Sequence, residues 1–522
     1  MATRYELLEG LRRRGEAEWG RLLKTADLRV ALCYPSPYHV GMSSLGFQAI
    51  YRELNAHAGV AAERVFLPDD VEAWARARVT PVSEETLTPL DAFPVLAFSV
   101  AYELEVPGVF ALLEAAGLSA FREQRPEAAP LVVAGGPLTF SNAEPLEPFV
   151  DVVVQGEADD LVHQLVDEVQ AGGGKRAVLE RLARRPGFRV PGLSGAESRF
   201  FVMKASDERL PARSQILTPH TELKDMFLIE PERGCSRGCH YCVMRRTTNG
   251  GMRTVPPERV LELIPPQAKR VGLVGAAVTD HPRIVELLEA IVSGGREVGV
   301  SSLRADRLTL PLVQALEKGG AKVLTVASDG ASQRMRELVD RKHSEAQLLN
   351  AARLAKEAGL KRLKVYSIVG LPLETDADLD ELVGFTLELT KILPVALGVA
   401  PFVAKRNSPL DGSPFAGIDV VEARLTRLRK GLKGRAELRP ISARWAWVEY
   451  LLAQCGPEGG LAAHDAWKAG GSFRAWERAF EARGCRPYEA RRTVDGRRNA
   501  TAWPTLGVAP SVSPALPSER GP

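Results

Sequence analysis

Three cysteines stand close together near the middle of the chain, at Cys235, Cys239 and Cys242. They follow the apolar run 226–229, which predicts a short strand that would present them on a loop. Three thiolates can bind three irons of a four-iron cluster and leave the fourth iron open to another ligand. The spacing therefore favours an iron-sulfur site with one free coordination position.

A structural zinc site is the alternative interpretation, with His240 or a distant histidine as fourth ligand. Such sites usually bring their ligands in two separated pairs, and the sequence has no second closely spaced pair of Cys or His. A disulfide framework is disfavoured because six cysteines in 522 residues are sparse. We expect Cys455 and Cys485 to be buried free thiols rather than cluster ligands.

The charge balance indicates which partners to exclude. Lys plus Arg number 68 and Asp plus Glu number 65, a formal net charge of +3, which does not indicate a nucleic-acid or membrane partner. The N-terminus lacks a secretory signal pattern, and no later run reaches the ~18 apolar residues of a membrane span. We expect a cytoplasmic protein, a compartment that suits free thiols and an oxygen-sensitive cluster.

The first part of the chain predicts a doubly wound α/β domain. Residues 1–26 predict an amphipathic helix, and residues 27–171 alternate short apolar runs with helical stretches, as in a Rossmann-like parallel sheet with crossover helices. Residues 172–222 predict a connector with little regular structure. The expected strands are 29–33, 64–67, 95–99, 131–134 and 151–154.

Residues 223–418 predict a second alternation of strands and helices. Six units are fewer than the eight of a closed barrel, so we expect a partial β/α barrel that opens to one side. Residues 419–500 predict helices, and residues 501–522, dense in Pro and Ser, predict a disordered tail. The expected barrel strands are 227–230, 270–274, 298–301, 322–327, 362–369 and 396–400.

The cysteine spacing, with Tyr241 before the third cysteine, resembles the cluster loop of the radical S-adenosylmethionine (radical SAM) superfamily. The resemblance covers about residues 27–410. It implies that Cys235, Cys239 and Cys242 hold a 4Fe-4S cluster that cleaves S-adenosylmethionine reductively to a 5'-deoxyadenosyl radical. It also implies a flavodoxin- or ferredoxin-type electron donor.

Further segments at the predicted strand ends resemble the superfamily's cofactor site. The loop 275–277 stands where the family often has Gly-Gly-Glu, but the Glu is absent, so only a backbone role carries over. A glycine or an ion pair at one strand end has an ordinary structural explanation, whereas joint placement at successive strand ends favours a binding site. The candidate S-adenosylmethionine contacts are Tyr241, Gly275, Ala276, Ser302, Arg304, Asp329, Gly370 and Leu371.

The segments 132–137 and 151–157 resemble the cobalamin-binding domain that precedes many radical SAM barrels. Glycines at strand ends let a bulky nucleotide tail approach the backbone. The loop around His39 departs from the Asp-x-His-x-x-Gly pattern of histidine-ligated cobalamin, so we expect an ordinary loop histidine there. The candidate cobalamin contacts are Ser99, Gly135, Gly136, Gly156 and Glu157.

The resemblance implies a cobalamin-dependent methyltransferase with a small-molecule or unknown substrate. A radical rearrangement or cyclisation enzyme without cobalamin is the alternative. Methylthio transfer is disfavoured because Cys33 alone precedes the cluster motif, and a non-catalytic iron-sulfur or zinc scaffold or RNA-binding module lacks an aromatic-rich basic patch. The sequence assigns no catalytic acid or base. Five tryptophans predict helix core more than a cavity wall, namely Trp445, Trp447, Trp467, Trp476 and Trp503.

Overall fold

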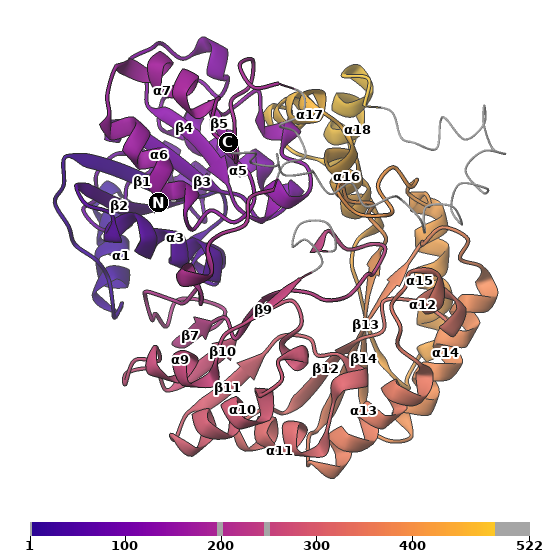
Figure 1. Ribbon diagram of the computed structural model, residues 1–522. Helices are drawn as coiled ribbons and strands as arrows, with labels where there is room; N and C mark the ends of the chain where they lie inside the picture. The colour runs from indigo at the N-terminus through magenta and orange to yellow at the C-terminus, as the bar shows by residue number, and fades with distance from the viewer. Residues whose placement is uncertain (1–2, 196–201, 245–250, 486–522) are drawn as a thin grey trace, which may run out of the picture.

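The computed structural model describes residues 3–195, 202–244 and 251–485 (Figure 1). The N-terminal part, in indigo and magenta, lies above the strands of the second part, and the last helices, in yellow, lie beside the N-terminal part. No helix within the described residues is long and apolar enough to cross a membrane. The tail at 501–522, for which disorder was predicted, lies outside the described residues.

The chain begins with helix α1, Arg4–Glu16. Thr3 and Glu6 form a capping box, in which each side chain accepts the other residue's backbone N–H, so the helix start is fixed locally. The helix is shorter than the predicted range 1–26, and the chain then continues without a helix to the first strand.

The N-terminal sheet has six strands in the order β2-β1-β3-β4-β5-β6. The first five are parallel, and β6 pairs antiparallel with β5. All five predicted strands are present, and the doubly wound α/β class is confirmed. Strand β6 was missed because its two residues lie in a segment without periodicity. The strands are β1 Leu28–Tyr34, β2 Val60–Phe66, β3 Val95–Ser99, β4 Leu131–Gly135, β5 Val152–Val154 and β6 Phe188–Arg189.

Helices cover both faces of this sheet because successive strand residues point to opposite sides. Val30 and Leu32 belong to one buried cluster with residues of α3 and α6, whereas Ala31 and Cys33 belong to another with residues of α5. The helices of this part are α2 Tyr38–Gly41, α3 Leu45–Ala56, α4 Val71–Arg76, α5 Val106–Ala115, α6 Leu161–Gln170 and α7 Gly174–Leu182.

The guanidinium of Arg64, in β2, is fully buried between two carboxylates. Its Nη2 lies 2.6 Å from Glu18 Oε2, and its Nε lies 2.7 Å from Glu85 Oε1. A charge this deeply buried is tolerated only when it is paired and hydrogen-bonded. The triad therefore ties the segment after α1 to β2 and to the loop that precedes β3.

The second part is an open β/α barrel of seven parallel strands in two sheets. The sheets have the orders β11-β10-β7 and β12-β13-β14-β15, and an isolated bridge between Leu303 and Val326 joins them. All six predicted strands are present. The strands are β7 Met226–Ile229, β10 Arg270–Leu273, β11 Glu297–Val300, β12 Val323–Ala327, β13 Arg362–Val369, β14 Val395–Pro401 and β15 Glu437–Pro440.

Strand β15 corrects the prediction that residues 419–500 are helical. Three of its four residues are exposed, so the segment lacks the buried alternation by which a strand is read from sequence. Most consecutive helices contact one another around the outside of the barrel (Figure 1). They are α9 Pro257–Glu262, α10 Ile284–Ser293, α11 Leu310–Lys318, α12 Gln333–Leu338, α13 Glu345–Glu357, α14 Asp376–Thr390 and α15 Ile418–Leu432.

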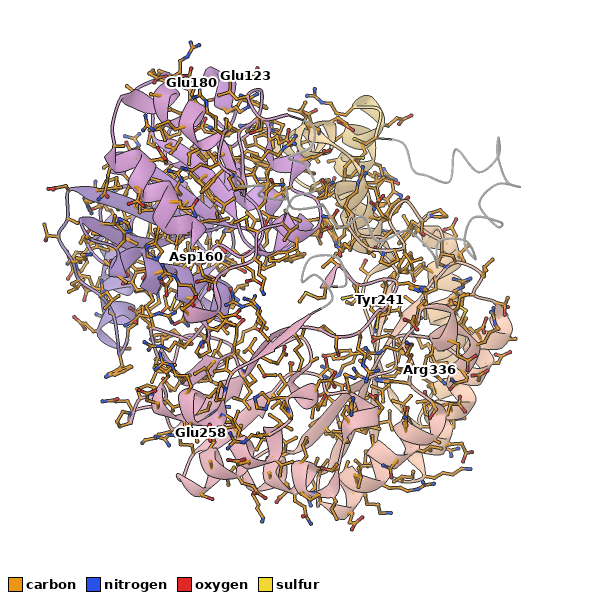
Figure 2. The ribbon with its side chains drawn as sticks, in the orientation of Figure 1. Glu123, Asp160, Glu180, Tyr241, Glu258 and Arg336 are labelled. Carbon is orange, nitrogen blue, oxygen red and sulfur yellow. The ribbon has the colours of Figure 1, made fainter. Side chains whose placement is uncertain are left out.

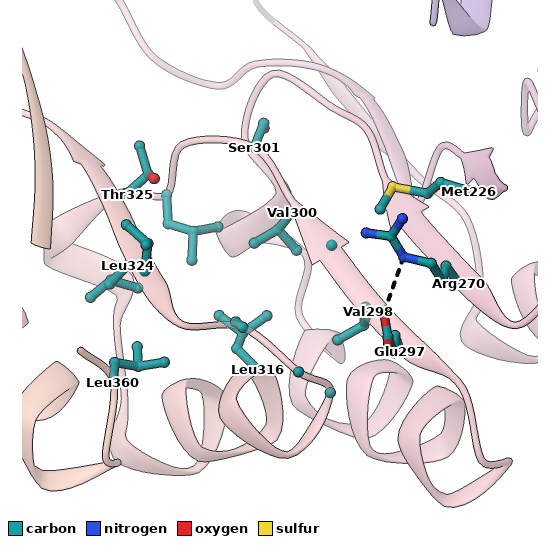
Figure 3. Close-up of a pocket in the computed structure, with 16 residues that line it drawn as sticks. Met226, Arg270, Glu297, Val298, Val300, Ser301, Leu316, Leu324, Thr325 and Leu360 are labelled. Carbon is teal, nitrogen blue, oxygen red and sulfur yellow. Dashed lines mark hydrogen bonds and ion pairs between the residues drawn. The ribbon is translucent and has the colours of Figure 1, made fainter. Parts of the chain in front are cut away.

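A cavity of about 190 Å³ lies where the two barrel sheets meet (Figure 3). Residues of both sheets line it, among them Val300 from β11 and Leu324 from β12. At its edge an ion pair joins Arg270 Nε to Glu297 Oε2 at 3.0 Å, and the residues predicted to contact a cofactor do not belong to its wall. The seam between the sheets is therefore loosely filled.

Three further helices close the described chain, α16 Ala443–Gln454, α17 Pro457–Lys468 and α18 Phe473–Ala482. Helix α17 contacts α5, so this region packs against the N-terminal sheet domain as well as the barrel. Trp447 is buried against Phe473 and Phe480, and Trp476 is also buried, as expected for helix core. Trp445, by contrast, is 41% exposed.

Candidate functional site

The three cysteines lie on the loop of a β-hairpin, between β8 Glu232–Gly234 and β9 Met252–Thr254. They line one cavity of about 90 Å³, with Cys239 buried and Cys235 and Cys242 partly buried. Burial raises the pKa of the Cys242 thiol to about 11 and raises the pKa of Cys235 as well. A metal that binds here must therefore displace protons from the thiols, as iron and zinc both do.

The wall of this cavity gathers several of the predicted S-adenosylmethionine contacts. Tyr241, Ala276, Ser302 and Arg304 line it together with the three cysteines. Gly275 adjoins Ala276 in the loop after β10. Strand ends far apart in sequence thus converge on the cluster loop, as the parallel barrel requires.

Asp329 is not among the residues that line the cavity, but it contacts two that do, in a chain of polar contacts that ends on a cysteine. Tyr241 Oη donates to Asp329 Oδ2 at 2.7 Å, and Arg341 Nε lies 2.9 Å from the same oxygen. Arg341 Nη1 donates to Cys239 Sγ at 3.8 Å. Burial, and then the Asp329 carboxylate, raise the pKa of Tyr241, so the phenol stays a donor. Figure 2 places Tyr241 near the centre of the molecule.

Arg341 was missed in the sequence analysis. It follows α12 rather than a strand, and the sequence motif gives no signal for it. Its guanidinium brings a positive charge to the cysteine loop, where a cluster held by thiolates would carry negative charge.

The buried guanidinium of Arg304 is held by two carboxylates of the chain itself. Its Nη1 lies 2.9 Å from Asp280 Oδ2 and its Nη2 lies 2.5 Å from Asp306 Oδ2. Arg237, from the cysteine loop, also reaches Asp306 at 3.1 Å, and His343 Nε2 lies 2.8 Å from Asp306 Oδ1. Although burial alone would raise it, the contacts with His343 and Arg304 lower the pKa of Asp306. Arg304 therefore anchors the cavity wall through this network.

Glu232 is a second residue that the sequence analysis missed. Its side chain is fully buried behind the loop after β10, where Oε1 accepts the Ala277 N–H at 2.8 Å. A Cβ at Gly275 would lie 2.1 Å from that oxygen, so a larger residue there would require the Glu232 side chain to move. Oε2 has no hydrogen-bond partner among the described residues. Burial raises the pKa of Glu232 to about 7, and the nearby carboxylates of Glu230 and Asp280 add to this rise. The hydrogen bond from the Ala277 N–H lowers the pKa, but burial outweighs it.

Gly370 and Leu371 do not belong to the residues that line the cluster cavity. The Gly370 N–H donates to Glu374 Oε1 at 2.9 Å, and a Cβ at Gly370 would meet Ala416 and Val421. Leu371 is buried in the core. Their adenine-binding role stays a prediction.

A larger cavity of about 400 Å³ lies between the N-terminal sheet and the barrel. Its wall is mostly apolar, with Leu32 and Ala97 from the sheet and Ala49 from α3, and barrel-side residues such as Val274 complete it. All five candidate cobalamin contacts belong to this wall, namely Ser99, Gly135, Gly136, Gly156 and Glu157.

Two of these glycines are required by contacts within the protein. Gly136 has φ +100°, and a Cβ there would lie 2.7 Å from the Val100 carbonyl oxygen. Gly156 has φ +94° and would meet the Met203 carbonyl at 2.5 Å. A Cβ at Gly135 would have no neighbour closer than 3.6 Å. All three glycines line the cavity, and at Gly136 and Gly156 a side chain is excluded by the neighbouring backbone.

Glu157 has partners that its sequence interpretation did not include. It forms ion pairs with Arg233 at 3.4 Å and with Arg253 at 2.5 Å, which belong to the β8–β9 hairpin. This carboxylate therefore holds the β8–β9 hairpin, on which the cysteines lie, against the C-terminal edge of the N-terminal sheet.

Met244, two residues after the last cysteine, lines both cavities. The cysteine cavity and the apolar cavity therefore adjoin at one side chain. His39, in contrast, lies outside both walls; its side chain is 46% exposed and its Nδ1 lies 3.7 Å from Asp69 Oδ1. It is a surface histidine, and it lies in the short helix α2 rather than in the expected loop.

Known proteins resemble this chain in both parts. The family described as radical SAM proteins, N-terminal, matches residues 46–191, and the radical SAM superfamily matches residues 229–386. A protein of Methanocaldococcus jannaschii described as uncharacterized is 26% identical over 402 residues, 74% of this chain and 80% of that protein. The 2-(S-pantetheinyl)-carbapenam-3-carboxylate methyltransferase of Streptantibioticus cattleyicolor is 26% identical over 290 residues, 49% of this chain and 40% of that enzyme.

Among solved structures, the radical SAM methyltransferase TsrM from Kitasatospora setae, with cobalamin and a 4Fe-4S cluster bound, matches with a TM-score of 0.52 at 14% identity. The match covers 76% of this chain and 75% of that one, and at this identity it shows a shared fold. With the two family matches and the convergence of the cysteine loop and the strand ends on one cavity, the chain belongs to the radical SAM superfamily of enzymes.

Proposed function

We propose that this enzyme is a cobalamin-dependent radical SAM methyltransferase whose substrate is still to be identified. The observation that carries the proposal is the pair of adjoining cavities that share Met244. One is lined by three thiols, and the other is apolar and bordered by the glycine-bearing ends of a parallel sheet, the usual place for a nucleotide-like cofactor in such folds. This arrangement suits two cofactors that act on one substrate.

The donor set fits a 4Fe-4S cluster with Cys235, Cys239 and Cys242 as ligands. Arg341 would stabilise the charge on the Cys239 sulfur. We assign the ribose hydroxyls of S-adenosylmethionine to the Asp329 carboxylate, and its methionyl amino group to the loop of Gly275 and Ala276. The carboxylate of Glu232, directly behind this loop, would offset the positive charge of that amino group.

The apolar cavity fits the nucleotide tail of a corrinoid. Ala97 and Leu32 would contact the tail, and Gly135 leaves space for a ring system to approach the backbone. When bound, the two cofactors would supply the 5'-deoxyadenosyl radical and the methyl group. The protein's own part is to orient them, to exclude water, and to keep Met244 between them. A flavodoxin- or ferredoxin-type protein is the proposed electron donor.

The test is anaerobic reconstitution of the purified chain with iron, sulfide and hydroxocobalamin. We expect about one corrinoid per chain in the wild type and in the control Ala75→Trp, which lies on exposed helix α4. Ala97→Trp, which fills the apolar cavity, should retain none while still forming 5'-deoxyadenosine. A wild type that forms 5'-deoxyadenosine and never retains the corrinoid would leave the cobalamin-free rearrangement or cyclisation enzyme as the function.

The cluster is tested separately. Cys239→Ser should lose both the iron and 5'-deoxyadenosine formation, because one of three iron ligands is gone. Cys33→Ala is the matched control, since Cys33 is a fully buried thiol in β1 and does not line the cluster cavity. If Cys239→Ser keeps both properties, these cysteines do not hold the catalytic cluster. If the wild type takes up zinc and no iron, the protein is instead the non-catalytic zinc scaffold or RNA-binding module considered as the alternative.

A further inference from the structure

A second group of metal-ligating side chains lies at the corner between α16 and α17, where the fold brings Cys455 and Cys485 together with Glu458. Each residue offers one ligand atom, and the three atoms all lie within 4.8 Å of one another. Cys485 is buried, Cys455 is partly buried, and Glu458 is exposed. Both cysteines are free thiols, as expected from the sequence, and the structure places them side by side.

The separation of these atoms suits a tetrahedral metal ion. Zinc binds sulfur at about 2.3 Å and carboxylate oxygen at about 2.0 to 2.2 Å, so its tetrahedral donors lie roughly 3.5 Å apart. Small movements of the three side chains would bring their donor atoms to that spacing. Thiolate and carboxylate together favour a borderline-soft divalent ion over magnesium or calcium, which prefer oxygen alone.

The charge pattern agrees with this geometry. Two thiols and a carboxyl group offer ligand atoms that lie within 4.8 Å of one another, so they would place like charges side by side if all three were ionised without a cation. A divalent cation would remove the conflict because it neutralises two thiolates at once.

The corner is held rigidly by the N-terminal domain. Asn142 Nδ2 donates to three backbone carbonyls of this corner, at 3.1 Å to Leu452, 3.2 Å to Ala453 and 2.7 Å to Cys455. A Cβ at Gly459 would lie 2.8 Å from the Cys455 Cβ, so glycine is needed for the approach. The position of Cys455 is therefore fixed by contacts that do not depend on a bound ion.

We propose that Cys455, Cys485 and Glu458 bind one divalent ion of the zinc class, with water in the fourth position. The ion fastens the end of α18 to the α16–α17 corner, which Asn142 in turn joins to the loop after β4. Because Gly136 and the apolar cavity adjoin the same loop, the ion stabilises the junction between the C-terminal helices and the N-terminal sheet domain. The site is independent of the function proposed above.

The test counts metal at this site alone. Full-length protein with Cys235→Ala, Cys239→Ala and Cys242→Ala lacks the other cysteine site and is titrated with cobalt(II) under anaerobic conditions. We expect one equivalent to bind with a thiolate-to-cobalt charge-transfer band, and zinc to displace it. Adding Cys455→Ser or Cys485→Ser should weaken binding by at least about 100-fold, since even outer partners of metal ligands cost about 10- to 100-fold. Adding Cys33→Ala should change nothing.

Glu458→Gln keeps the test decisive if a cysteine variant misfolds, because Glu458 is exposed and its replacement leaves the core intact. It should weaken cobalt binding by about 10-fold or more. Absence of the charge-transfer band in folded protein overturns the proposal. A disulfide between Cys455 and Cys485 in protein prepared without oxygen, seen by mass spectrometry as the loss of two hydrogens, also overturns it.

Discussion

Replacement of Glu232 by glutamine should stabilise the enzyme, and more so as the pH rises. Burial raises the pKa of this carboxyl from 4.5 to about 7, so the folded state binds the proton more tightly than the unfolded state. That difference stabilises the fold below about pH 4.5 and is lost as the pH rises through 7. At about 1.36 kcal/mol per pKa unit, the penalty at pH 8 is about 3 kcal/mol. The glutamine side chain would keep an acceptor for the Ala277 N–H and carry no charge.

The assay is urea unfolding of the cofactor-free protein under anaerobic conditions, from pH 4.5 to 8.5. The free energy of unfolding of Glu232→Gln should exceed that of the wild type by about 3 kcal/mol at pH 8, and the difference should shrink toward pH 5. Glu258→Gln is the control, because Glu258 is exposed on α9. A difference that does not vary with pH, or a variant less stable at pH 8, would show that Glu232 ionises normally and that the argument from burial is wrong.

Three further changes test other parts of the structure. Arg64→Met should lower the free energy of unfolding by about 3 to 5 kcal/mol, because it leaves Glu18 and Glu85 buried without a cation; a loss below about 1 kcal/mol in urea titrations would contradict this. Asp329→Asn should weaken S-adenosylmethionine binding by about 10-fold or more in equilibrium dialysis, and unchanged binding would remove the ribose assignment. Gly136→Ala should reduce the thermal midpoint and corrinoid retention together, because of its φ of +100° and the close backbone of the preceding loop; a variant that matches the wild type in both would show that the loop adapts.

The strands of both sheets could be predicted because each carries a buried apolar run. β1 and β14 are buried along almost their whole length, so composition alone marks them. β15 could not be found in this way, since its register is set by pairing with β14 while its side chains stay in solvent. Tertiary pairing, rather than local pattern, made it a strand.

The cysteine motif predicted the location of the site, and parallel topology predicted that Ala276 and Ser302 would join it. Arg341 and Glu232 could not be predicted because their roles arise from contacts across the fold: one reaches a cysteine about a hundred residues earlier, and the other lies behind a later loop. The proximity of Cys455 and Cys485 likewise could not be predicted, because helix packing rather than sequence spacing brings the two thiols together.

The single bridge between Leu303 and Val326 has a mechanical consequence for the barrel. Within each barrel sheet, neighbouring parallel strands are paired over several residues. The two sheets, in contrast, are joined by this bridge beside a cavity (Figure 3). Moving the two sheets apart would therefore break few backbone hydrogen bonds. We therefore expect the wall to yield here first, so that amide hydrogens of β11 and β12 exchange with deuterium faster than those of β13. The two sheets could therefore move apart at this seam while the strand pairing within each sheet stays intact.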